Sequence, residues 1–168
     1  LARLVKQRNP TTVVVTGGPH PTIFPEEMLA SDAVDVVVMG EGERTIRELL
    51  SAIEPGISRY AAIQGLAWKD RNNIVVNAPR ELITDLDALS FPDRADLDTL
   101  EGYMYLAGIK ISFGRRMLNL IASRGCSFNC SFCQPALGRI HGHQVRYRTP
   151  ENVFQEIEYL REKWGVQT

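Results

Sequence analysis

The stretch Val13-Val14-Val15-Thr16-Gly17-Gly18 decides how the first half of this chain is built. A run of β-branched residues closed by paired glycines is typical of a strand that is buried on both faces, as the strands of parallel sheets are. Residues 34–39 repeat this pattern with consecutive valines. The sequence therefore predicts two buried strands close together in the chain.

Helical patterns follow each of these strands. Residues 25–27, Pro-Glu-Glu, suit a first helical turn, and apolar residues at 46, 49, 50 and 53 mark one face of a second helix. This alternation predicts adjacent parallel strands joined by right-handed crossovers, the arrangement of a doubly wound α/β sheet. Residues 65–69 and 74–77 flank a turn and predict a hairpin that adds an antiparallel edge.

The second half of the chain begins with a predicted linker. Residues 79 to about 102 mix aspartates, prolines and single leucines, which suits an extended connection between domains. Residues 117–122 then predict a strand that runs into a cysteine-containing loop, and Thr149 with Pro150 predicts the start of a helix. The predicted domains are 1–78 and 117–168, with residues 79–116 between them.

Composition excludes some classes of function. Lys and Arg number 19 and Asp and Glu 20, so the net charge of -1 offers no basic surface for a nucleic-acid backbone. No apolar run approaches the ~20 residues that span a bilayer, and residues 1–10 do not read as a signal peptide. Because the chain starts without Met and inside an amphipathic pattern, we expect a piece of a larger, cytoplasmic protein.

The strongest chemical signal is a cluster of three cysteines. Cys126, Cys130 and Cys133 are the 3 cysteines of the chain and fall on one short loop, which suits a metal site in a reducing compartment better than disulfides. Three thiolates can each bind a different iron of an iron-sulfur cluster, which leaves the fourth iron open to a chelating small molecule. Two other interpretations are a zinc site completed by His141 or His143, and three buried thiols.

Phe132 before the last cysteine makes the loop more specific. With it, Cys126, Cys130 and Cys133 resemble the cysteine motif of the radical S-adenosylmethionine (SAM) family. The resemblance implies that the three cysteines hold a 4Fe-4S cluster and that Phe132 lines the adenine pocket of SAM. It also implies reductive cleavage of SAM to methionine and a 5'-deoxyadenosyl radical.

The loop after the first predicted strand carries a second signal. Gly17-Gly18-Pro19-His20-Pro21-Thr22 follows the carboxyl end of that strand, where open α/β sheets bind ligands, although a Gly-Gly pair is also a simple exit from a strand. With Gly40-Glu41-Gly42-Glu43 and the linker, residues 1 to about 102 resemble the second half of a cobalamin-binding domain. The resemblance implies that Gly17, Gly18, His20 and Thr22 contact cobalamin. The family's Asp-x-His-x-x-Gly motif has no counterpart in this sequence.

Three other groups of polar residues receive simpler interpretations. Glu41 and Glu43 suit the start of the helix that follows them. His141 and His143 lie in a Gly-rich stretch and are expected to be solvent-exposed loop residues. Arg146 and Arg148 alternate with apolar residues, which predicts a solvated strand face.

The chain is therefore predicted to be α/β: the C-terminal half of a doubly wound, Rossmann-like cobalamin-binding domain, then the first strand-loop-helix unit of a radical SAM partial (β/α) barrel. It resembles magnesium-protoporphyrin IX monomethyl ester oxidative cyclase-like proteins and radical SAM methyltransferases. The resemblance implies radical cyclisation or methylation of an unactivated carbon, with a 4Fe-4S cluster, SAM and cobalamin as cofactors. This piece alone is expected to be inactive.

The expected partners are a small-molecule substrate, porphyrin-like rings among the candidates, and an electron donor such as flavodoxin or ferredoxin. Neither nucleic acid nor a membrane span is expected, and exposed strand edges predict self-association. Two alternatives stay open. One is a radical SAM enzyme whose upstream domain is degenerate and binds no cobalamin, and the other is a non-catalytic zinc-binding module.

Overall fold

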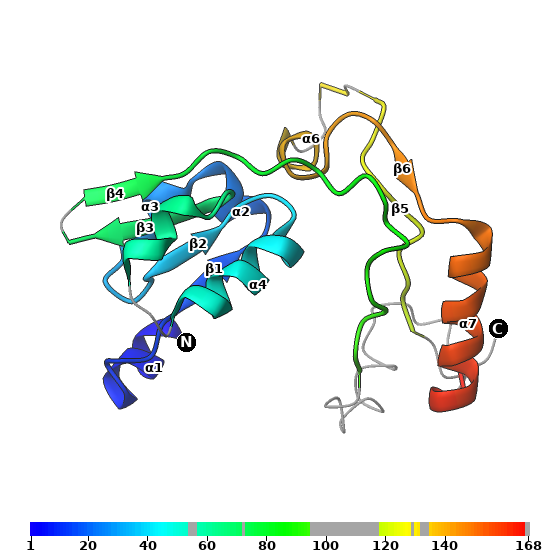
Figure 1. The fold of residues 1–168 in the computed structure, drawn as a ribbon, viewed down its shortest axis with the longest axis horizontal. Helices are drawn as coiled ribbons and strands as arrows, with labels where there is room; N and C mark the ends of the chain where they lie inside the picture. Colours follow the sequence, from blue (N-terminus) through cyan, green and yellow to red (C-terminus); the bar gives the residue numbers. More distant parts are fainter. Residues whose placement is uncertain (54–56, 72, 95–117, 129, 132–134, 167–168) are drawn as a thin grey trace. The chain divides into compact units, whose positions relative to one another are not determined.

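The computed structural model describes residues 1–53, 57–71, 73–94, 118–128, 130–131 and 135–166 (Figure 1). Their contacts form two compact units. The first unit comprises Leu1–Ile83 and Gly125–Val145, and the second comprises Thr84–Arg124 and Arg146–Thr168. The domain boundaries suggested by the sequence, 1–78, 79–116 and 117–168, stay a prediction.

A mixed sheet forms the centre of the first unit. Its strands are β1 (Val15–Gly17), β2 (Val36–Val38), β3 (Leu66–Asp70) and β4 (Asn73–Val76), and they lie in that order. β1 and β2 are parallel, whereas β3 pairs antiparallel with both β2 and β4. The parallel pair and the antiparallel hairpin edge are both as predicted, and the α/β class is confirmed.

Helices connect and cover these strands. They are α1 (Ala2–Arg8), α2 (Pro19–Ile23), α3 (Pro25–Leu29), α4 (Gly42–Ile53) and the 3-10 helix η1 (Ile57–Ala62). The interpretation of residues 17–22 as a plain loop was wrong, because α2 occupies most of them. Pro19 lacks an N–H and has a fixed φ, so it suits the first position of that short helix. Among the helices of the described ranges, none has the length and apolar character that crossing a membrane requires.

Alternate residues of β2 point to opposite faces of the sheet, as the two-residue period of a strand requires. Val36 and Val38 pack with Leu49 of α4 and with Trp68 of β3. Val37, which is fully buried, packs on the other side with residues of α3 and β3. α4 and α3 therefore cover opposite faces of one sheet (Figure 1), and three consecutive valines are explained by burial on both sides.

Tyr60 adds a pH dependence to this core. Its ring meets Trp68 edge-on with 5.7 Å between ring centroids, and burial, with a smaller contribution from Asp35, raises the pKa of the Tyr60 phenol. The neutral phenol is thus favoured by folding. Its contribution to stability is complete below the unfolded pKa of about 10 and is lost as pH rises through the raised folded value.

As pH rises from about 9 to 11, we expect the free energy of unfolding to fall less in Tyr60→Phe than in the wild type, because phenylalanine has no proton to lose. Urea unfolding at a series of pH values measures the difference. An equal fall of the free energy of unfolding in both proteins would show that Tyr60 does not contribute to the loss of stability at alkaline pH.

The second unit contains a two-stranded sheet and a long helix. β5 (Ser123–Arg124) pairs antiparallel with β6 (Arg146–Tyr147), and α7 (Pro150–Trp164) follows. Thr149 caps α7, as predicted, by accepting a hydrogen bond from the Asn152 N–H at 3.2 Å. The predicted strand over residues 117–122 was wrong in its described part, 118–122, because β6 provides ladder partners only for the two residues of β5.

A buried carboxylate organises the second unit. Glu156 of α7, with a side chain 1% exposed, accepts from Arg148 and lies 3.5 Å from Nη2 of Arg94. Arg148 also donates to the Ile121 carbonyl and stacks over the ring of Phe91. The prediction that Arg148 lies on a solvated face was therefore wrong, since its charge is neutralised inside the unit.

Candidate functional site

Two half-buried glycines, Gly18 and Gly40, mark one edge of the first unit's sheet, which we call the glycine edge. Gly18 follows β1 and Gly40 follows β2, with φ angles of 101 and 69 that only glycine adopts easily. A Cβ added to either residue would meet nothing within 4 Å, whereas one on Gly17 would lie 3.2 Å from the Val38 carbonyl oxygen. Because β1 and β2 are parallel, both turns lie at the same edge, and this edge can receive a ligand directly against the backbone.

Thr22 ties the two turns together. Its hydroxyl donates to the Gly18 carbonyl oxygen at 2.8 Å and accepts from the Gly40 N–H at 3.0 Å. The hydroxyl hydrogen of Thr22 is thus used inside the protein. One lone pair of its oxygen remains and can accept a hydrogen bond from a ligand.

His20 lies on the exposed side of α2. Its side chain is 56% exposed, and its Nε2 lies 3.7 Å from a carboxylate oxygen of Glu27. The four residues predicted to contact cobalamin, Gly17, Gly18, His20 and Thr22, therefore share one turn and the short helix after it. Their contact with cobalamin stays a prediction.

The cysteine loop begins directly after β5. Cys126 is half-buried and Cys130 is exposed, and both carry free thiols. Cys133 and Phe132 lie outside the described residues, so the predicted cluster site and SAM contact stay predictions. Within the part of the chain that the structure describes, no group of three or more His, Cys, Asp or Glu side chains could hold a metal.

The segment after the cysteine loop contacts the first residues of that loop. α6 (Pro135–His141) packs against α2, and its last turn is closed by the Gly142 N–H, which donates to the Gly138 carbonyl oxygen at 2.9 Å. The Cys126 N–H donates to the Gly142 carbonyl oxygen at 3.4 Å. Gly125 approaches Gln144 so closely that an added Cβ would lie 2.3 Å from its carbonyl oxygen.

Glu41 joins this segment to the sheet edge. Its carboxylate, 2% exposed, accepts from the Ile83 N–H at 2.8 Å and contacts Nδ1 of His141 at 3.1 Å. Because a carboxylate only accepts hydrogen bonds, the proton of this contact belongs to Nδ1. The interpretations of Glu41 as a simple helix-starting acid and of His141 as a solvent-exposed loop residue were both wrong. His143 is exposed as expected, and its ring lies over Gly138.

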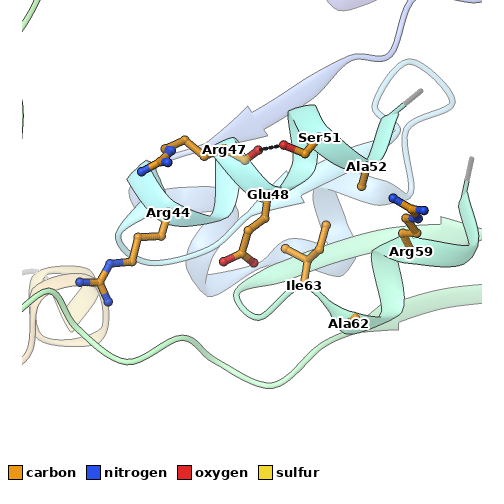
Figure 2. A pocket seen from close by; sticks show the side chains of 8 residues that line it. All are labelled: Arg44, Arg47, Glu48, Ser51, Ala52, Arg59, Ala62 and Ile63. Atoms are coloured by element: carbon orange, nitrogen blue, oxygen red, sulfur yellow. Dashed lines mark hydrogen bonds between the residues drawn. The ribbon is translucent and has the colours of Figure 1, made fainter. Parts of the chain in front are cut away.

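A hollow in the first unit lies elsewhere. It has a volume of about 590 Å³ and is formed by α4 and η1 (Figure 2). Arg44 and Arg47 point outward from α4, and Glu48 pairs with Arg80. None of the residues singled out from the sequence lines this hollow, which is therefore not the candidate site.

Known proteins match the range that contains Gly18 and Gly40, and some match almost the whole chain, the cysteine loop included. The B12 binding domain family matches residues 1–50. The chain is 36% identical to an uncharacterized methyltransferase of Pyrococcus horikoshii, over 99% of the chain and 34% of that protein. It is 34% identical to the anaerobic magnesium-protoporphyrin IX monomethyl ester cyclase of Rubrivivax gelatinosus, over 98% of the chain and 28% of the cyclase.

Solved structures share the fold. The radical S-adenosylmethionine methyltransferase TsrM from Kitasatospora setae, with cobalamin and a [4Fe-4S] cluster bound, matches at a TM-score of 0.70 and 20% identity, over 98% of this chain and 31% of TsrM. The cobalamin-dependent S-adenosylmethionine radical enzyme OxsB matches at a TM-score of 0.69 and 18% identity, over 98% of this chain and 21% of OxsB. The chain thus spans about a third or less of the length of these proteins.

Proposed function

Because this chain belongs to the radical SAM proteins that carry a B12-binding domain, we propose that it is part of a cobalamin-dependent enzyme that modifies an unactivated carbon by cyclisation or methylation. One observation carries the proposal. A single compact unit contains both the glycine edge and the start of the cysteine loop, with α6 packed on α2. Two cofactors bound by these two segments would therefore be bound by the same compact unit.

The residues present fit the two groups. Thiolates of Cys126, Cys130 and Cys133 would bind a 4Fe-4S cluster, and the open backbone at Gly18 and Gly40 would receive cobalamin. When bound, the cluster supplies the electron that cleaves SAM, and cobalamin supplies the chemistry for cyclisation or methylation. Phe132 would contact the adenine of SAM.

The chain's own residues set the geometry of the edge. Thr22 fixes the distance between the Gly18 and Gly40 turns through two hydrogen bonds. Glycine at both positions keeps side chains away from the surface, so a flat ligand can lie against main-chain atoms. The site is thereby ordered before a ligand arrives, which lowers the entropy that binding must overcome.

The wider setting completes the proposal. The substrate is a small molecule, with porphyrin-like rings among the candidates, and the electron comes from a flavodoxin or ferredoxin in the cytoplasm. Similarity to an uncharacterized methyltransferase, at 36% identity, and to a cyclase, at 34% identity, supports keeping both reaction types in the proposal.

Anaerobic reconstitution of the full-length protein, followed by cobalamin titration, tests the proposal. We expect at least three irons per chain and a saturable cobalamin complex. Fewer than three irons would end the radical SAM assignment. A normal cluster without cobalamin binding would instead favour a degenerate upstream domain.

A glycine variant sharpens the cobalamin part. Gly18→Val places a branched side chain on the open edge, and we expect the dissociation constant for cobalamin to rise about tenfold or more while the iron content is unchanged. Gly165→Ala is the matched control, because Gly165 also has a positive φ of 62 but caps α7 in the second unit. If both variants bind cobalamin with equal affinity, the Gly18 turn is not part of the cobalamin site.

One observation favours the zinc alternative. Glu41 orients His141 through Nδ1, and carboxylates commonly orient histidines that bind zinc. Replacing His141 and His143 together by Ala would then abolish metal binding. The cluster proposal instead expects that double variant to assemble a cluster with the wild-type iron content, measured before any chelator is added.

A further inference from the structure

We propose that Glu41 is a positioning residue for the cluster loop. Its buried carboxylate holds His141, and through His141 it holds the turn on which Cys126 rests. This inference rests on the proposed function, because it concerns the loop that would bind the cluster. It gives the Gly-Glu-Gly-Glu segment a role that the glycine edge alone does not require.

The burial of Glu41 makes its geometry rigid. A carboxylate that is 2% exposed keeps its charge only when hydrogen bonds replace water, and here the Ile83 N–H and His141 Nδ1 each reach a different oxygen. The two oxygens therefore bind the end of the segment after β4 and the end of α6. Movement of either donor would therefore remove a hydrogen bond from a buried carboxylate.

Close backbone contacts continue from His141 to Cys126. Gly142, with a φ of 74, lies so near Leu82 that an added Cβ would be 2.7 Å from its Cδ1. The same Gly142 offers its carbonyl oxygen to the Cys126 N–H. Gly125 is pressed against the Gln144 carbonyl oxygen in the same way. The Cys126–Gly142 and Gly125–Gln144 contacts involve main-chain atoms, so they cannot yield by a change of side-chain rotamer, whereas Leu82 contacts Gly142 through its side chain.

The consequence concerns the retention of the cluster rather than its assembly. Loops that bind metals gain part of their order from the metal, and hydrogen bonds around the ligands adjust the cluster's properties. A loop whose first ligand is fixed in advance should release iron more slowly than a loose one. Glu41 should therefore slow the loss of iron without being a ligand itself.

The test uses the full-length protein, reconstituted anaerobically, and five variants. These are Glu41→Ala, Glu41→Gln, His141→Ala, the double variant Glu41→Ala with His141→Ala, and the control Glu48→Ala. Glu48 is a suitable control because it lies on α4 in the same unit and also forms an ion pair, with Arg80. The readouts are the rate of iron loss to a chelator and the electron paramagnetic resonance signal of the reduced cluster.

We expect Glu41→Ala and His141→Ala to lose iron about tenfold faster than the wild type, and Glu48→Ala to lose it at the wild-type rate. The double variant should be no faster than Glu41→Ala alone, because both changes break the same connection. Glu41→Gln should lose iron at an intermediate rate, since its amide can accept from the Ile83 N–H and can donate to Nδ1 of His141 once the imidazole proton moves to Nε2.

A second measurement needs no cluster. In the cluster-free protein, we expect Glu41→Ala and His141→Ala to speed amide hydrogen exchange at Cys126, with no change for Glu48→Ala. If the wild type assembles no cluster, the proposed function fails while this exchange result still decides the role of Glu41. Wild-type iron loss and wild-type exchange in folded His141→Ala would overturn the proposal, even if Glu41→Ala did not fold.

Discussion

Replacement of Cys126 by Ser is expected to reduce the iron content of the reconstituted full-length protein to below about one tenth of the wild-type value. The serine hydroxyl is a hard, protonated group at neutral pH, so it cannot replace a soft thiolate. A cluster left with two protein ligands would be lost during desalting. Cys130→Ser and Cys133→Ser should have the same effect, and iron and sulfide analysis with absorption spectra measures all three.

Ser127→Ala is the matched control for the cysteine variants. Ser127 is an exposed residue of the same loop, one position after Cys126, and has no thiol to lose. We expect this variant to hold wild-type iron. Retention of a full cluster by any single cysteine variant would contradict the three-thiolate assignment, because the remaining two thiols could not anchor four irons.

Local sequence patterns predicted the parts of the fold that depend on neighbours along the chain. The buried strand at 36–38 follows from a run of valines, and the start of α7 follows from a threonine before a proline. Both signals act within a few residues, because strand burial and helix capping are local. The α/β class could be inferred from their order alone.

Partners distant in sequence could not be predicted in this way. Glu41 and His141 are 100 residues apart, and neither periodicity nor spacing connects them. A glutamate before a helix satisfies the local rule for N-terminal acids whether it points to solvent or, as here, into the protein. Arg148 was misjudged for the same reason, since its alternation with apolar neighbours says nothing about a carboxylate on α7.

These long-range contacts share a physical feature. Glu41 and Glu156 are both buried acids whose hydrogen bonds hold segments that have little regular structure of their own. Short strands such as β5 and β6, with two residues each, contribute few ladder hydrogen bonds. Buried charges of this kind specify which segments meet, and their removal should cost more than the removal of a surface ion pair.

Glu156→Ala should therefore destabilise the second unit by about 3–5 kcal/mol, because Arg94 and Arg148 would keep buried charges without their carboxylate. Exchange of α7 amides during urea unfolding measures the loss. Glu162→Ala, an exposed acid on the same helix, should change the unfolding free energy by no more than about 0.5 kcal/mol.

A triple variant separates charge compensation from simple loss of packing. If Arg94, Arg148 and Glu156 are all replaced by Met or Leu, no charge is left buried, and we expect most of the stability lost in Glu156→Ala to return. The other hydrogen bonds of Arg148, to Ile121 and Asn152, would still be missing, so recovery should be incomplete. A triple variant as unstable as Glu156→Ala would mean that the arginines stabilise the unit mainly through those carbonyl and amide contacts rather than through Glu156.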